Sequence, residues 1–166
     1  NIKQLNGLSK LTNLMKLDLF CCFNLQNIDG LSNLISLTHL DLSHCHFKNF
    51  NEIGKLTKLK ILNLAYCKNI QMVKVLEKLT NLTNLNLSGC SYIKNIDTLK
   101  NLTKLTFLDL SFCENLKNIE CFLEYKILDI FEVVVHDILL LISLNVQLQL
   151  GSMMVLYVSS LVIWND

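Results

Sequence analysis

A pair of leucines separated by one residue recurs along this chain at an almost constant interval. The intervals are 23, 22, 23 and 23 residues, and the pairs begin at Leu17, Leu40, Leu62, Leu85 and Leu108. In every copy a cysteine follows at the same offset, as in the segments LTHLDLSHC and LTFLDLSFC. A fixed period of this length indicates a repeat architecture in which each unit packs only against its neighbours.

Between the leucine pairs, apolar residues recur at every third position. In the fourth unit this series reads Ile93, Ile96, Leu99, Leu102, Leu105. The alternation at Leu-x-Leu is the period of a β-strand, whereas a step of three suits tight 3₁₀ turns. The second unit lacks one residue just after its cysteine and then resumes the same step. Each unit is therefore predicted to form one coil, and the coils must stack because none can bury its apolar edge alone.

These units resemble the leucine-rich repeat family, whose signature is L-x-x-L-x-L-x-x-N/C-x-L. The resemblance implies an α/β solenoid, a right-handed coil with a concave parallel β-sheet and a convex side of 3₁₀ turns and loops. The short period is similar to phosphatase-regulator and internalin-type repeats, and the LDLSxC wording also resembles repeats of plant intracellular immune receptors. Phe131-x-Val133, with His136 in the cysteine position, continues the pattern as a degraded sixth strand. We expect an array over residues 1–136 and a distinct apolar segment over residues 137–166.

The repeated cysteines are predicted to be structural. They occupy the point where each strand bends into its turn, at Cys22, Cys45, Cys67, Cys90 and Cys113. A cysteine there points inward and acts as a small apolar side chain with a weak S–H donor. Disulfides between coils are disfavoured because stacking makes the Cβ vectors parallel, and zinc requires ligands at short local spacing. We therefore expect no metal and no cofactor.

Outward-facing strand residues are predicted to form columns across the concave face, and these columns are the candidate binding surface. The Asp/Asn column inside Leu-x-Leu could receive a basic or hydrogen-bonding partner, although Asp-Leu-Ser is also ordinary repeat wording. Exposed aromatic side chains are enriched at binding hot spots. A further outward column contains Phe20, Ser43, Ala65, Ser88 and Ser111. The predicted partner-binding residues are Asp18, Phe20, His39, Asp41, Asn63, Tyr66, Asn86, Phe107, Asp109 and Phe112.

Other functions are disfavoured by composition and motifs. The net charge is +1 and arginine is absent, which argues against nucleic-acid binding. No glycine-rich phosphate loop is present, and no small-molecule substrate is indicated. His39, His44 and His46 lie close in sequence and Cys21 is expected to stack beside His44, but no third group orients a Cys–His pair for catalysis. We therefore expect a non-catalytic module that binds a protein partner.

The end of the chain changes character. Residues 138–164 carry no charge and are long enough to span a bilayer, so a membrane-attached receptor or surface protein is the alternative. Against that reading, alternating apolar residues over 142–150 and a Gly151-Ser152 turn favour a β-hairpin that caps the array. Non-native sequence is a third possibility. Seven cysteines without a paired pattern favour a reducing compartment, so we expect a cytoplasmic location.

Overall fold

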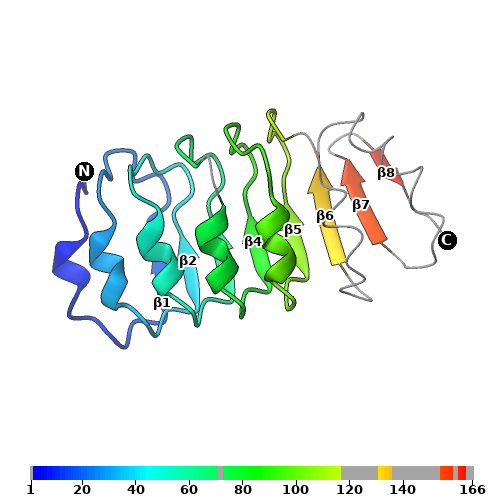
Figure 1. The fold of residues 1–166 in the computed structure, drawn as a ribbon. Helices are drawn as coiled ribbons and strands as arrows, with labels where there is room; N and C mark the ends of the chain where they lie inside the picture. Colours follow the sequence, from blue (N-terminus) through cyan, green and yellow to red (C-terminus); the bar gives the residue numbers. More distant parts are fainter. Residues whose placement is uncertain (1, 71–72, 117–130, 136–153, 159–160, 164–166) are drawn as a thin grey trace.

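The protein folds as a solenoid of stacked coils in the computed structural model (Figure 1). The structure describes residues 2–70 and 73–116 in full and the backbone of strands at 131–135, 154–158 and 161–163. Each complete coil contributes one three-residue strand to a sheet and one short 3₁₀ helix to the opposite side. The repeat fold predicted from the sequence is therefore confirmed.

The strands follow one another in chain order across a single sheet. Strands β1 to β7 are parallel, and β8 runs antiparallel to β7. The strands are β1 (Lys16–Asp18), β2 (His39–Asp41), β3 (Ile61–Asn63), β4 (Asn84–Asn86), β5 (Phe107–Asp109), β6 (Phe131–Val135), β7 (Met154–Val158) and β8 (Leu161–Ile163). The 3₁₀ helices are η1 (Asn6–Leu8), η2 (Asp29–Asn33), η3 (Asn51–Lys55), η4 (Lys74–Lys78) and η5 (Asp97–Asn101).

The register of the sheet places equivalent repeat positions side by side. Leu40 pairs with Leu17 on one side and with Leu62 on the other, and the same alignment continues to β5. In-register stacking puts equivalent repeat positions one above the other, so each position becomes a column of side chains across β1 to β5.

The core is the interior of the coil, and it is built almost entirely of leucine and isoleucine. The leucines and isoleucines at every third position between strands are fully buried, as Ile93, Ile96 and Leu99 illustrate. Burial of each such side chain contributes roughly 1.5–3 kcal/mol relative to exposure. In the second unit, Phe47 is buried where the other units place Leu or Ile, so the one-residue deletion leaves the core continuous.

The sheet extends beyond the five regular coils. If Phe131-x-Val133 replaced the leucine pair, Phe131 would lie beside Leu108. Instead, β6 pairs with β5 so that Val133 lies beside Leu108, a shift of two residues. The interval from Leu108 to Val133 is 25 residues, longer than the 22 or 23 residues between paired leucines of the regular strands. The expected turn at Gly151-Ser152 and the boundary at residues 136 and 137 lie outside the described residues.

An antiparallel pair does occur near the end of the chain, where β7 and β8 flank residues 159–160. This pair lies at other residues than the hairpin expected around Gly151-Ser152, and a cap on the array stays a prediction. In the part of the chain that the structure describes, no helix has the length and apolar character needed to cross a membrane.

Candidate functional site

Every regular strand leaves the sheet through the same tight turn. The cysteine N–H closes the turn on the carbonyl of the second strand leucine, as between Cys45 N and Leu42 O at 3.1 Å. The residue before the cysteine has a left-handed backbone, a conformation that favours glycine. Its φ lies at 58–59° in Cys21, His44, Tyr66 and Phe112, and at 67° in Gly89.

The Asp/Asn column supports this turn in all five coils. The Asp41 Oδ1 atom accepts the Ser43 N–H at 2.8 Å, and Asn63 Oδ1 accepts the Ala65 N–H at 3.1 Å. Asp18, Asn86 and Asp109 accept the equivalent N–H groups. One side-chain oxygen is enough for this bond, so an amide serves as well as a carboxylate.

A row of rings in mutual contact lies near the strand exits, and we call Phe20, His44 and Tyr66 the aromatic ridge. The Phe20 and His44 rings meet edge to face at 5.6 Å between centroids. The His44 and Tyr66 rings stack at 4.7 Å with an interplanar angle of 14°. Phe20 is 57% exposed and Tyr66 is 40% exposed, so the ridge presents apolar surface to solvent.

Gly89 makes room for the end of the ridge. A Cβ atom at Gly89 would overlap the Tyr66 ring, at 2.6 Å from Cε1 and 2.9 Å from Cγ. The Tyr66 ring therefore lies over the backbone of the next coil. One coil further, Phe112 occupies the same left-handed position and is 43% exposed.

The other predicted partner-binding residues lie on the same face. Asp18 is exposed, whereas Asp41, Asn63, Asn86 and Asp109 are half-buried. His39 and Phe107 are half-buried at equivalent positions of β2 and β5, and Ile61 is 39% exposed between them. The structure thus brings the ten predicted residues onto one surface; whether they contact a partner stays a prediction.

One expected outward column is in fact covered. Ser43, Ala65, Ser88 and Ser111 are only 3–7% exposed, although strand alternation predicts them to face solvent. Their carbonyls accept N–H groups from the left-handed residue of the preceding coil, as between His44 N and Ala65 O at 2.8 Å. The coils approach closely at this point, so only a small side chain fits there. Phe20 in the first coil is the exposed exception.

The cysteine column points inward and joins neighbouring coils. The Cys67 Sγ atom donates to Leu42 O at 3.1 Å, and Cys90 Sγ donates to Leu64 O at 3.1 Å. Cys45 and Cys113 make the same contact at 3.2 Å. Each carbonyl thereby accepts both an N–H from its own coil and an S–H from the next. Cys22, in the first coil, is half-buried and packs against the core.

Burial makes these thiols unreactive. Desolvation raises the pKa of Cys67, Cys90 and Cys113 to about 12 and that of Cys45 to about 11. The thiolate is the nucleophilic form of cysteine, so a thiol that stays protonated at neutral pH does not attack substrates. A structural role is what this geometry supports.

The three histidines near Cys21 make separate contacts. His44 stacks in the aromatic ridge, His46 tilts against Phe23 at 6.2 Å, and His39 Nδ1 lies 2.8 Å from Thr38 Oγ1. Among the described residues, no three His, Cys, Asp or Glu side chains gather as metal ligands do. His44 and Gly89 belong to the site but were not among the predicted partner-binding residues. Their shared place in the strand-exit column is the signal that could have identified them.

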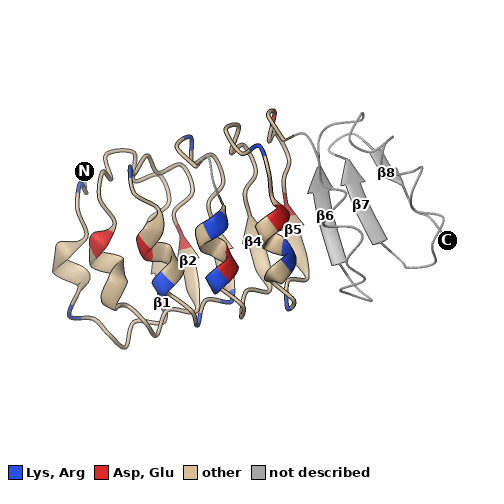
Figure 2. Ribbon diagram, viewed as in Figure 1, with Lys and Arg blue, Asp and Glu red and all other residues tan. Residues whose placement is uncertain are grey.

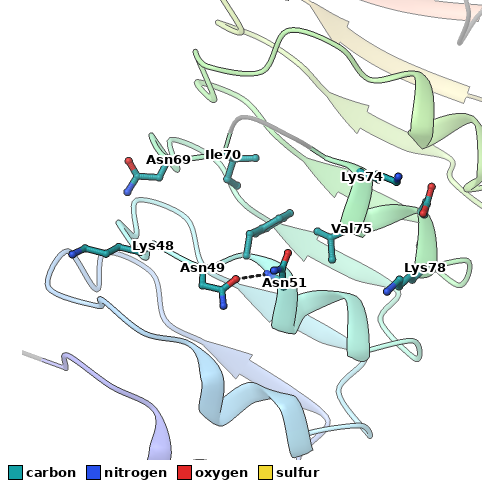
Figure 3. A pocket seen from close by; sticks show the side chains of 10 residues that line it. Lys48, Asn49, Asn51, Asn69, Ile70, Lys74, Val75 and Lys78 are labelled. Carbon is teal, nitrogen blue, oxygen red and sulfur yellow. Dashed lines mark hydrogen bonds between the residues drawn. The ribbon is translucent and has the colours of Figure 1, made fainter.

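A hollow lies on the convex side, between η3 and η4 (Figure 3). It has a volume of about 620 Å³, and its apolar lining comes from Phe50, Ile70 and Val75. Lys48, Lys74, Lys78 and Glu77 supply charged groups around it. In the view of Figure 3, Lys48 and Lys74 extend in different directions, so the hollow does not concentrate its lysines on one point.

Comparisons with known proteins agree with this architecture. The family described as At1g61320/AtMIF1, LRR domain, matches residues 20–163. The crystal structure of an internalin (inlF) from Listeria monocytogenes is 27% identical, with a TM-score of 0.68 over 84% of this chain. That of an internalin C2 (inlC2) from the same species is 20% identical, with a TM-score of 0.70 over 81% of this chain, and shows the fold alone.

The chain spans only part of these structures, 41% of the internalin and 57% of the internalin C2. No curated protein matches the sequence. Three observations agree: the repeat period, the parallel sheet with equivalent positions in register, and the family match over residues 20–163. The chain belongs to the leucine-rich repeat family.

Proposed function

We propose that this array is a non-catalytic protein–protein interaction module that binds its partner on the concave face. Leucine-rich repeat folds generally serve as interaction scaffolds, and the buried thiols offer no nucleophile. A preformed sheet also binds without a large ordering cost, because its surface residues are held by the stacked coils.

The observation that carries this proposal is the choice of residues at the strand exits. A left-handed backbone costs a non-glycine residue roughly 1–2 kcal/mol, and glycine would avoid that cost. Gly89 demonstrates that the turn accepts glycine. Even so, His44, Tyr66 and Phe112 place large rings at this position, and Tyr66 and Phe112 are exposed. Backbone strain that keeps an exposed ring in place is typical of binding surfaces.

Random peptides displayed on phage provide a test, because such selections find the surface that binds peptides best. Selected peptides are measured against Phe20→Ala, Tyr66→Ala and Phe112→Ala. We expect each variant to weaken binding by about tenfold or more, as for aromatic hot spots. The matched controls are Ile35→Ala and Tyr92→Ala, which remove side chains that are 55% and 51% exposed outside the concave columns. The proposal would be contradicted by peptides whose binding falls in the two control variants and is unchanged in the Phe20, Tyr66 and Phe112 variants.

We also propose a cytoplasmic location, which the free thiols support. The six cysteines that the structure describes are unpaired. Cell fractionation of a tagged protein tests this location. Recovery in the membrane pellet, or in the secreted fraction, would be the contrary result.

A further inference from the structure

We infer that the partner segment on the concave face is extended and basic, carrying lysine or arginine beside apolar side chains. This inference rests on the proposed function, because it specifies the chemistry of the partner for the same surface. The surface is an open sheet face with exposed apolar residues, of which Phe20, Ile61, Tyr66 and Phe112 are each at least 39% exposed.

Charge is distributed unequally between the two sides of the array. Within residues 2–70 and 73–116, the concave face carries the carboxylates of Asp18, Asp41 and Asp109 against one lysine, Lys16. The rest of residues 2–70 and 73–116 carries twelve lysines against five carboxylates. Figure 2 shows these lysines on the 3₁₀ helices and connecting loops. The concave face is thus the acidic side of an otherwise basic array, and it attracts cations and repels phosphate groups.

The concave carboxylates are not neutralised within the described residues. No lysine there lies within 4.0 Å of Asp18, Asp41 or Asp109, whereas Lys55 and Glu52 form an ion pair at 2.7 Å on the convex side. Asp41 Oδ2 already accepts the Asn63 side-chain amide at 2.8 Å, whereas Asp18 and Asp109 each use one oxygen for the turn bond. At Asp18 and Asp109 a basic side chain of a partner would therefore gain a new electrostatic interaction without displacing an existing one.

Apolar and acidic groups alternate on this face at short distances. Asp18 and Phe20 are two residues apart at the first strand, and Phe107 and Asp109 are two residues apart on β5. Lysine and arginine have an apolar stem and a charged head, so they match a ring next to a carboxylate. Neighbouring strands lie about 4.8 Å apart, so β1 and β5 are separated by about 19 Å. An extended segment of about six residues covers that distance.

The fold offers variants that remove charge and preserve structure. Asn63 and Asn86 already make the turn hydrogen bond that the aspartates make elsewhere. A triple variant with Asp18→Asn, Asp41→Asn and Asp109→Asn should therefore keep its turn bonds and its circular dichroism spectrum. Its melting temperature should fall slightly, because Asp41→Asn loses the bond that Asp41 Oδ2 accepts from Asn63 Nδ2. The matched control carries Asp29→Asn, Glu52→Gln and Glu77→Gln, three convex carboxylates on η2, η3 and η4.

Fluorescence anisotropy with a labelled decalysine peptide tests the inference, and decaglutamate serves as the reversed-charge probe. We expect the concave triple variant to bind decalysine about tenfold more weakly than the wild type, with the difference lost at high salt. The convex triple variant should change affinity less than about twofold, since screening confines each charge to about 8 Å. Equal weakening by both variants, or a wild type that does not bind decalysine, would overturn the inference.

The phage selection separates this inference from the proposed function. Peptides that need the aromatic ridge but lack basic residues, or bind the concave triple variant normally, would leave the proposed function standing and contradict a basic partner. Peptides that bind elsewhere than on the concave face would contradict both the proposed function and the inference of a basic partner.

Discussion

At the scale of single residues, the cysteine column is the most consequential position of the repeat. Each buried thiol fills a small space in the core and donates to a carbonyl of the preceding coil. A charged or larger side chain at this place has no water and no partner to compensate it. The position therefore tolerates small apolar or weakly polar groups only.

Substitutions at Cys67 test this role. Cys67→Ala should lower the free energy of unfolding by about 1–2 kcal/mol, because it removes one sulfur atom and one weak hydrogen bond. Cys67→Asp should cost several kcal/mol, because it buries an unpaired carboxylate. Urea unfolding followed by circular dichroism measures both values. Two variants of equal stability would mean that the Cys67 position is open to water.

The Asp/Asn column gives a different prediction. Alternation alone treats Asp41 as a surface residue that can be lost without effect, but its carboxylate accepts the Ser43 N–H, and Ser43 is 3% exposed. Asp41→Ala should cost about 1–2 kcal/mol, because the Ser43 N–H and the Asn63 side-chain amide both lose their acceptor. Asp41→Asn keeps the turn bond, loses only the bond from Asn63, and should cost less. Thermal unfolding of the two variants distinguishes these cases. Identical melting temperatures for the two variants would show that the turn hydrogen bond does not stabilise the fold.

At the scale of the element, the strand exit is a compact turn that combines three requirements. It needs an oxygen from the Asp/Asn column, a small residue that fits between coils, and a left-handed residue before the cysteine. The first two stabilise the array, while the third presents a side chain outward. The same turn thus stabilises the array and exposes the side chain of the left-handed residue on the concave face.

Gly89→Ala tests how the turn and the aromatic ridge are coupled. The new methyl group would overlap the Tyr66 ring, and the φ of 67° disfavours alanine. We expect a loss of about 1–2 kcal/mol in stability and weaker binding of peptides that require Tyr66. Gly7→Ala is the control, because a Cβ atom at Gly7 meets no atom within 4 Å. Unchanged stability and binding in Gly89→Ala would show that the Tyr66 ring moves freely.

At the scale of the whole molecule, stability comes from contacts between successive coils. Leucine columns, strand pairing and S–H bonds all join residues about 22–26 positions apart. Threonine side chains add further contacts between coils, as between Thr83 Oγ1 and Lys60 O at 3.1 Å. A change of conditions that destabilises one repeat position therefore acts on that position in every coil.

Alkaline pH should disturb the cysteine column in this way. Burial raises the folded pKa of four thiols from 9.0 to about 11 or 12, so their protonated form stabilises the fold. That contribution is complete below about pH 9 and is lost as pH rises towards about 12, because the unfolded chain releases the protons first. Urea unfolding at about pH 8 and about pH 10.5 should show a decrease.

The control for this pH dependence is a variant without the four buried thiols. It carries Cys45→Ala, Cys67→Ala, Cys90→Ala and Cys113→Ala. It retains every lysine, so its stability reports any other alkaline effect. An equal decrease in wild type and control would assign the pH dependence to groups other than the buried thiols.

The sequence by itself determined the solenoid, its period and the inward cysteines. Apolar residues at a fixed interval are buried together only when the coils stack, so the hydrophobic effect determines which side of each coil faces the core. The tertiary structure decided the rest. The burial of Ser88, the left-handed turn at Tyr66 and the stacking of His44 depend on atoms of the next coil. Local alternation carries no information about such contacts, because they exist only once the coils have stacked.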